Sequence, residues 1–329
     1  MAELIKIIQP NSDILIEDKN LLSESELNEE YKKIKAVIES EDWKEAYKNN
    51  FKEDYDKILT EEADLIAMGI VAAIAIGAII AKLISWLKGK YNESVKKLLA
   101  QSKELNDIYT KVNDLLSNNR KVAFKHRNDI IDAEIHSAVM IDKKDSSKVY
   151  KLYLDQLVFN SDSFIKYLTE IINYSSSKSS NDKERVEMLN RKVDSMIADI
   201  DEYVMNNNGY IYTCEPSIKI TKYKNKRLKE VVYAYKQWVD EVYKIIDIYN
   251  QNISAQLQYL QVLETAYKKM SFDYSKDKDA KAAVDKLFKH LLKTATASMD
   301  FNSKALIIFN EMIKYYSDAL HKIYDDIRS

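Results

Sequence analysis

The chain has 329 residues, of which 46% are hydrophobic and 31% are charged, so it can bury a large core and is not a disordered polymer. It contains only 4 glycines and 2 prolines, too few for the turns of sandwiches, barrels and doubly wound folds, which predicts a mostly helical fold. The 50 basic and 52 acidic residues give a net charge of -2, so any partner must be recognised by local features. Cys214 is the single cysteine, which excludes an intrachain disulfide and fits a reducing compartment.

Residues 1–22 are expected to form an N-terminal arm, because Pro10 and the polar residues after it interrupt a short apolar run. They lack the basic start and apolar core of a secretory signal peptide, so we expect synthesis in the cytoplasm without one. Ser23 and Glu26 have the spacing of a capping box, which predicts the start of a first helix. A second helix is expected from Ser40, with aromatic residues repeating every four positions at Trp43, Tyr47, Phe51 and Tyr55.

The most apolar part of the chain is residues 65–87. Its first 17 residues, 65–81, carry no polar side chain, and Lys82 is the first charge. A helix of this segment would be about 35 Å long, enough for a hydrocarbon core of about 30 Å. Acidic residues precede the segment, Lys88 and Lys90 follow it, and Trp86 suits a membrane interface while Lys82 can extend toward one. The pattern predicts a membrane-entering helix; a helix buried on all sides in a soluble bundle is the alternative.

Small residues recur at every fourth position of this segment. A ridge of this kind lets helix backbones approach closely in lipid, which favours a helix dimer or ring. The candidate membrane and helix-packing residues are therefore Gly69, Ala73, Gly77, Ala81 and Ser85, together with Lys82 and Trp86.

The rest of the chain is predicted to be amphipathic helix with one exception. Helical spacing is expected over residues 92–116, from about 120 to 141 and again to residue 174, so that residues 23–174 form one helical region. The stretch 175–182, SSSKSSND, is predicted to be a flexible linker. The exception is residues 210–221, where two β-rich runs flank Pro216 and predict a small hairpin within the region 183–329.

A long helix is predicted from about residue 224 to 270, because no helix breaker occurs there. Apolar residues recur at alternating steps of three and four up to Tyr249, which indicates a coiled-coil seam, and the phase slips beyond Asn252. A last helix follows toward the C-terminus. The predicted fold class is all-α: an elongated bundle of long amphipathic helices or coiled coil, with one strongly apolar helix and a minor hairpin.

No enzymatic motif is present. Asp129, Asp132 and His136 would share one face of a helix, but they lack the Glu-x-x-His pairs of ferritin-like sites, so no metal is expected. Cys214 has no base beside it and is interpreted as a packed thiol. With glycines only at 69, 77, 89 and 209, neither a phosphate-binding loop nor a dinucleotide fingerprint can be written, so no cofactor is expected.

One basic patch stands beside the predicted hairpin. It consists of Lys219, Lys222, Lys224, Lys226 and Arg227. Such a patch can contact phosphates of lipid or nucleic acid, although the balanced overall charge makes nucleic acid an unlikely partner for the chain as a whole.

The single apolar segment in a chain of long soluble helices resembles, in architecture, the α-helical pore-forming toxins. The absence of a signal peptide and the Lys-, Ile-, Asn- and Tyr-rich composition resemble the internal, cargo or ejection proteins of tailed bacteriophages. These resemblances imply a place in a virion interior or release toward a target membrane. We therefore expect a non-enzymatic protein that enters a bilayer through residues 65–87, alone or as a homo-oligomer. The alternative is a soluble oligomeric structural or cargo protein of a virion, in which residues 65–87 form a core helix.

Overall fold

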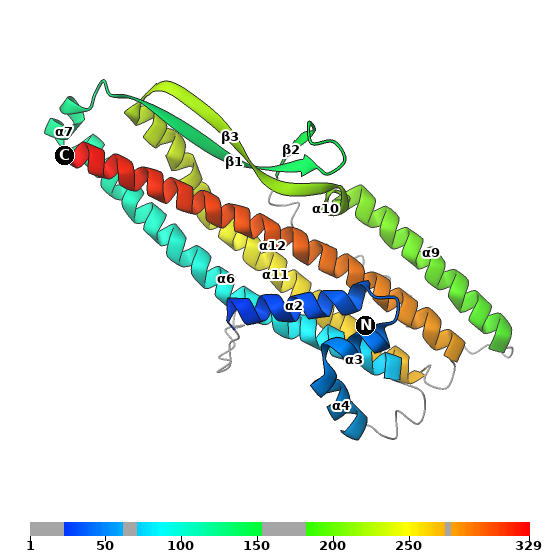
Figure 1. Ribbon diagram of the computed structural model, residues 1–329. Coiled ribbons are helices and arrows are strands. Elements are labelled where there is room, and N and C mark those ends of the chain that lie inside the picture. Colours follow the sequence, from blue (N-terminus) through cyan, green and yellow to red (C-terminus); the bar gives the residue numbers. More distant parts are fainter. Residues whose placement is uncertain (1–22, 62–70, 153–181, 274–277) are drawn as a thin grey trace, which may run out of the picture. The chain divides into compact units, whose positions relative to one another are not determined.

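The protein is described by a computed structural model in which residues 23–61, 71–152, 182–273 and 278–329 are placed. These residues are mostly helical, with one small three-stranded antiparallel sheet (Figure 1). The prediction of a helical fold with a minor β element is thereby confirmed. The expected arm 1–22 and all but the last residue of the expected linker 175–182 lie outside the described residues.

The chain divides into two compact units. Unit 1 comprises Met1–Asn92, Asn160–Asp201 and Ile253–Ala295, and unit 2 comprises Glu93–Phe159, Glu202–Asn252 and Thr296–Ser329. Three long helices contribute one part to each unit: α6 (Val71–Asn118), α11 (Leu228–Asp273) and α12 (Lys278–Arg328).

Unit 1 begins with three short helices, α2 (Glu24–Glu39), α3 (Trp43–Asn50) and α4 (Lys52–Glu61). The predicted capping box is present, since the Ser23 and Glu26 backbone N–H groups each donate to the other residue's side chain. The single helix expected from Ser40 is instead broken at Phe51, where φ is -133° and ψ is 52°. Trp43, Tyr47, Phe51 and Tyr55 are nevertheless all buried, so the aromatic stripe identified a packing face correctly and its continuity wrongly.

Helix α6 runs without a break past Gly89, where the sequence pattern suggests an interruption. One helical glycine costs only about 1 kcal/mol relative to alanine, so it need not end a helix. The glycine also allows a close approach, because a Cβ atom at this position would lie 2.9 Å from Cδ2 of Leu27 on α2.

The later long helices follow the predicted patterns. Helix α9 (Asp182–Asn208) contains the predicted amphipathic stretch, and α12 is the predicted C-terminal helix. In α11 the predicted seam residues are buried up to Tyr249, apart from the half-buried Trp238, and Ile253 to Tyr267 continue the buried face. The polar side chains of Asn252 and Gln256 are buried where the predicted phase slip occurs. A coiled-coil supercoil remains a prediction.

The sheet belongs to unit 2 and has the order β2-β1-β3, with β1 at Ile130–Asp142, β2 at Val149–Lys151 and β3 at Cys214–Arg227. Strands β1 and β3 run side by side over most of their length (Figure 1). The predicted hairpin 210–221 is wrong, because residues 210–213 form the helical turn α10 (Tyr210–Thr213) and β3 is one continuous strand. Pro216 is tolerated in β3 because β3 is an edge strand, where one side of the backbone has no strand partner.

The helix expected from about 120 to 141 is also wrong. Only the short α7 (Arg120–Lys125) is helical there, and β1 follows it. Asp132, Glu134 and His136 alternate with Ile131, Ala133 and Ile135, which is the period of a strand. The isoleucines also match helical spacing, and the partner strand lies far away in the sequence, which explains the error.

Candidate functional site

The three residues considered for a metal do not converge. Asp129 lies in the turn before β1, whereas Asp132 and His136 lie on the strand itself, so the helical spacing that would bring the three together is absent. The Asp129 carboxylate contacts Nδ1 of His126 at 2.6 Å, and the Asp132 carboxylate accepts the Asn225 backbone N–H at 2.8 Å. Within the described residues, no group of three or more His, Cys, Asp or Glu side chains is arranged to hold a metal ion.

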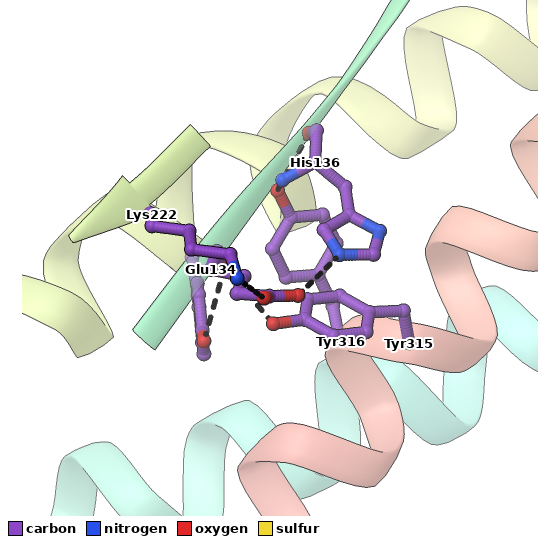
Figure 2. Close-up of polar contacts among 6 residues, drawn as sticks. Glu134, His136, Lys222, Tyr315 and Tyr316 are labelled. Atoms are coloured by element: carbon purple, nitrogen blue, oxygen red, sulfur yellow. Dashed lines mark hydrogen bonds and ion pairs between the residues drawn. The ribbon is translucent and has the colours of Figure 1, made fainter. Parts of the chain in front are cut away.

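His136 instead lies in a cluster of aromatic side chains that joins the sheet to α11 and α12. Its ring stacks on the ring of Tyr315, with centroids 3.6 Å apart and an interplanar angle of 11° (Figure 2). Its Nε2 is 3.5 Å from the Glu134 carboxylate, which also lies 3.9 Å from the Lys222 ammonium. Figure 2 shows these side chains gathered beside β1.

Hydroxyl groups from the helices bind the open edge of β1. Strand β2 pairs with β1 only at residues 139–141, so the peptide groups before that point need other partners. The His136 N–H donates to the Tyr316 hydroxyl at 3.1 Å, and the same hydroxyl lies 2.8 Å from the His136 carbonyl. Trp238 Nε1 donates to that carbonyl at 3.2 Å. The Glu134 carbonyl accepts from Tyr315 at 3.0 Å and from Tyr235 at 3.5 Å.

Two of these hydroxyls are hard to ionise because they are buried. Burial is the main reason why the pKa values of Tyr235 and Tyr316 are raised well above the ordinary value, and neighbouring tyrosines add to both shifts. Neutral hydroxyls can both donate and accept, which suits pairing with a strand edge. The cluster therefore holds the sheet on the helices.

A cavity of about 730 Å³ opens beside this cluster, within unit 2. Its charged lining is mixed: Asp129, Asp132, Glu134, Asp318 and Asp326 stand with Lys222, Lys224 and Lys322. Glu134 and Lys222 are already paired with each other, and Asp132 and Asp129 are engaged as described. We find no set of side chains in it that converges on one bound group.

The predicted membrane segment is described only from Val71, with side chains from Ala75. Ile76, Ile79, Ile80 and Leu83 are completely buried in unit 1. No helix among the residues described here has both the length and the hydropathy needed to cross a bilayer.

The predicted small-residue ridge does not have one environment. A Cβ atom added at Gly77 would lie 3.9 Å from the Tyr267 ring of α11, whereas Ala81 and Ser85 are exposed. Gly69 lies outside the described residues, and nothing is described of the side chain of Ala73.

Lys82 and Trp86 are both held by the helices α2–α4, which we call the cap. The Lys82 ammonium lies 2.6 Å from Asp54 and 3.9 Å from Glu30, and 4.4 Å from the centre of the Phe51 ring. Trp86 is buried and stacks on Tyr31 of α2 with ring centroids 4.1 Å apart. The cap thus provides partners for the one charge within residues 65–87 and for its one aromatic residue.

The predicted basic patch is exposed on β3, and Cys214 is buried at the start of that strand. Sequence reasoning missed the four side chains that hold β1, Tyr235, Trp238, Tyr315 and Tyr316. They are separated from their partners by about 100 to 180 residues. Helical spacing identified Tyr235 and Trp238 only as seam positions and did not single out Tyr315 or Tyr316.

Comparisons of the chain with protein-family models, with curated proteins and with solved structures gave no match. The function must therefore be argued from the residues themselves.

Proposed function

We propose that the protein is a non-enzymatic membrane-binding protein that inserts residues 65–87 into a bilayer after the cap moves off α6. The observation that carries the proposal is the environment of Lys82, whose ammonium is bound by the cap carboxylates Asp54 and Glu30. A charge inside an otherwise apolar stretch must be paired while the helix is packed, and it can extend to the interface once the helix lies in lipid.

The polar contacts between the cap and α6 are individually weak. They are partly exposed ion pairs, including a 3.5 Å contact between Lys90 of α6 and Glu24 of α2, and they stand beside the stack of Trp86 on Tyr31. The cap also carries buried apolar side chains, among them Ile34 and Val37, so its release must uncover apolar surface. Partly exposed ion pairs contribute little net stability, about 0–1 kcal/mol each. Trp86 would then exchange its stack on Tyr31 for a membrane interface, where tryptophan is favoured.

A second candidate function follows from a different observation. Ile76, Ile79, Ile80 and Leu83 are fully buried within unit 1, as expected of a permanent core helix. This favours the alternative of a soluble, oligomeric structural protein whose apolar helix never leaves the core.

One experiment separates the two. The full chain has three tryptophans, and the double variant Trp43→Phe, Trp238→Phe leaves Trp86 as the reporter within residues 65–87. Vesicles with bromine in the acyl chains quench a tryptophan only when it approaches the hydrocarbon. Insertion predicts strong quenching of Trp86 emission, and emission that stays unquenched on vesicles would contradict it.

The cap can be tested in the same assay. Asp54→Asn removes the closest partner of Lys82, so we expect Trp86 quenching to become faster. Glu53→Gln, at an exposed neighbouring position of α4, is the matched control and should leave the rate unchanged. Equal rates in both variants would show that the Lys82 contacts do not control release.

A further inference from the structure

Two of the most exposed large apolar side chains of the described residues lie close together in unit 2. Phe124 of α7 is 80% exposed and Ile130, the first residue of β1, is 62% exposed. Only residues 126–129 separate α7 from β1. Single exposed apolar side chains are common on protein surfaces, so these two point to a contact only in combination with the charges around them.

Six cations lie near these two residues, four of them in the same stretch of chain and two across the sheet from the start of β1. They are Arg120, Lys121, Lys125 and Arg127 from α7 and the turn after it, and Lys226 and Arg227 from the end of β3. Arg227 is the register partner of Ile130, and Lys226 that of Ile131. We call these six cations with Phe124 and Ile130 the α7 surface.

The one acidic side chain within this stretch of chain, Asp129, is engaged locally. Its carboxylate contacts His126 at 2.6 Å, and its carbonyl accepts the Leu228 N–H at 3.0 Å, which fixes the turn to the β3–α11 junction. The α7 surface therefore carries six positive charges in a chain whose net charge is -2. Besides Asp129, the acidic neighbours are Asp114, which lines a hollow together with Arg120 and Lys121, and Asp132, which binds the N–H of Asn225.

The end of β3 is shaped by a bulge. Between Ile131 and Ala133 the register shifts, and Asn225 adopts a left-handed conformation with φ of 54°. Asparagine tolerates this conformation better than most residues, and its N–H is held by Asp132 at 2.8 Å. The bulge interrupts the regular alternation of side chains between the two faces of β3 directly before Lys226 and Arg227. The positions of these two cations are therefore determined by a specific backbone feature.

We infer that the α7 surface is a docking site for the headgroups of an anionic lipid bilayer. Cations bind the headgroup phosphates and carboxylates, while Phe124 and Ile130 enter the interface between headgroups and acyl chains. Lipid is favoured over nucleic acid because the aliphatic side chain of Ile130 has no aromatic face on which a base can stack. This site is separate from residues 65–87, so it binds a bilayer whether or not that segment inserts.

The inference is tested by co-sedimentation of the full chain with vesicles. Vesicles of equal parts phosphatidylcholine and phosphatidylserine should bind the protein, and vesicles of phosphatidylcholine alone should bind it weakly. Raising the salt from about 0.1 M to about 1 M shortens the screening length from about 10 Å to about 3 Å and should release it. Equal binding to vesicles with and without phosphatidylserine would overturn the inference.

Two variants locate the site. Phe124→Ser should lower binding about tenfold or more, because it removes one inserted aromatic side chain. Lys125→Gln with Arg127→Gln should lower it about 25-fold, since each cation near an anionic surface contributes about fivefold. The matched controls are Ile307→Ser, 57% exposed on α12 of the same unit, and Lys97→Gln with Lys314→Gln on exposed helix positions.

The outcomes are distinct from those of the insertion experiment. Salt-sensitive binding that Phe124→Ser weakens and Ile307→Ser does not would support the α7 surface even if Trp86 is never quenched. Binding that all variants retain would overturn it, even if Trp86 is quenched. Binding of a DNA duplex that Phe124→Ser weakens, without vesicle binding, would replace lipid by nucleic acid as the partner.

Discussion

The two units bury polar groups in different ways. In unit 1 the buried Tyr267 hydroxyl binds a charged side chain: it donates to the Asp285 carboxylate at 3.0 Å, with Lys281 and Lys289 on the same helix. In unit 2 tyrosine hydroxyls and a tryptophan N–H bind peptide groups of a strand. Helices satisfy their own backbone, whereas a strand edge does not, so the sheet requires partners that a helical unit can omit.

The buried polar groups of the two units therefore differ in whether they can carry a charge. Burial raises the pKa of Asp285 above its ordinary value, and Lys281 and Lys289 oppose that shift, so unit 1 carries ionisable groups inside its packing. Unit 2 uses hydroxyls, which stay neutral at physiological pH. We expect apolar packing to dominate the stability of unit 1 and the hydroxyl-to-strand contacts to be essential in unit 2.

The largest effect is expected from the apolar face of α6. Ile80→Ala removes a completely buried side chain and leaves a cavity, which should lower the free energy of unfolding by about 2–5 kcal/mol. Chemical denaturation followed by the emission of Trp43 and Trp86, both in unit 1, measures it. The neighbouring exposed Ala81→Ser should change stability by no more than about 0.5 kcal/mol. Equal effects would mean that this face is not a packed core.

The next largest effect is expected from the Tyr316 hydroxyl, which binds strand β1 in unit 2. Tyr316→Phe leaves the ring in place but removes the hydroxyl that binds both the N–H and the carbonyl of His136, so it should cost about 1–3 kcal/mol. Trp238 emission reports on this unit. Tyr243→Phe, about half exposed on α11, is the control and should be neutral. A neutral Tyr316→Phe would remove the difference drawn between the units.

How far the sequence alone leads also differs between these regions. Few glycines and prolines, helical spacing and the Ser23 capping box were enough to predict the long helices and the start of α2. All of these signals are local. The sheet could not be predicted in the same way, because β1 pairs with β3 about 80 residues later and its isoleucines also satisfy a helical period.

The candidate sites follow the same rule. The basic residues of β3 were identified from composition, but the exposure of Phe124 and Ile130 beside Arg227 depends on strand pairing and on packing. The partners of Lys82 could not be foreseen, because Asp54 and Glu30 are only two of many acidic residues on neighbouring helices. The alternation of apolar and polar residues at 131–136 was the one local signal in the sequence for strand β1.

An alkaline transition should follow from the buried tyrosines. Their pKa is raised in the folded protein, so the folded state keeps its protons where the unfolded state begins to lose them, near pH 10. The stability that these neutral tyrosines contribute is fully present below pH 10. It is lost as the pH rises through the pKa of each tyrosine in the folded protein, which for Tyr47 is about 12. Circular dichroism with tyrosinate absorbance should therefore show unfolding together with ionisation above pH 10. Ionisation of all 23 tyrosines near pH 10 without unfolding would contradict it.

The smallest effect is expected from a kind of contact that occurs within each of the two units. Each unit has an exposed ion pair that joins α12 to another element: Lys286 with Asp194 at 2.7 Å in unit 1, and Lys304 with Glu215 at 3.0 Å in unit 2. The hydrogen bond from Lys304 lowers the pKa of Glu215, so this pair stabilises the fold above the ordinary glutamate pKa and loses its effect as pH falls through the lowered value.

Asp194→Asn and Glu215→Gln should each cost about 0.2–1 kcal/mol at neutral pH, because solvent screens both pairs, and both costs should shrink in high salt. Denaturation monitored by the tryptophans of each unit gives the two values side by side. Similar small costs would place the difference between the units in their buried groups, where Tyr316 and Ile80 test it. A cost of several kcal/mol for either variant would instead mean that surface ion pairs dominate the stability of that unit. The contrast between apolar packing in unit 1 and hydroxyl-to-strand contacts in unit 2 would then have to be withdrawn.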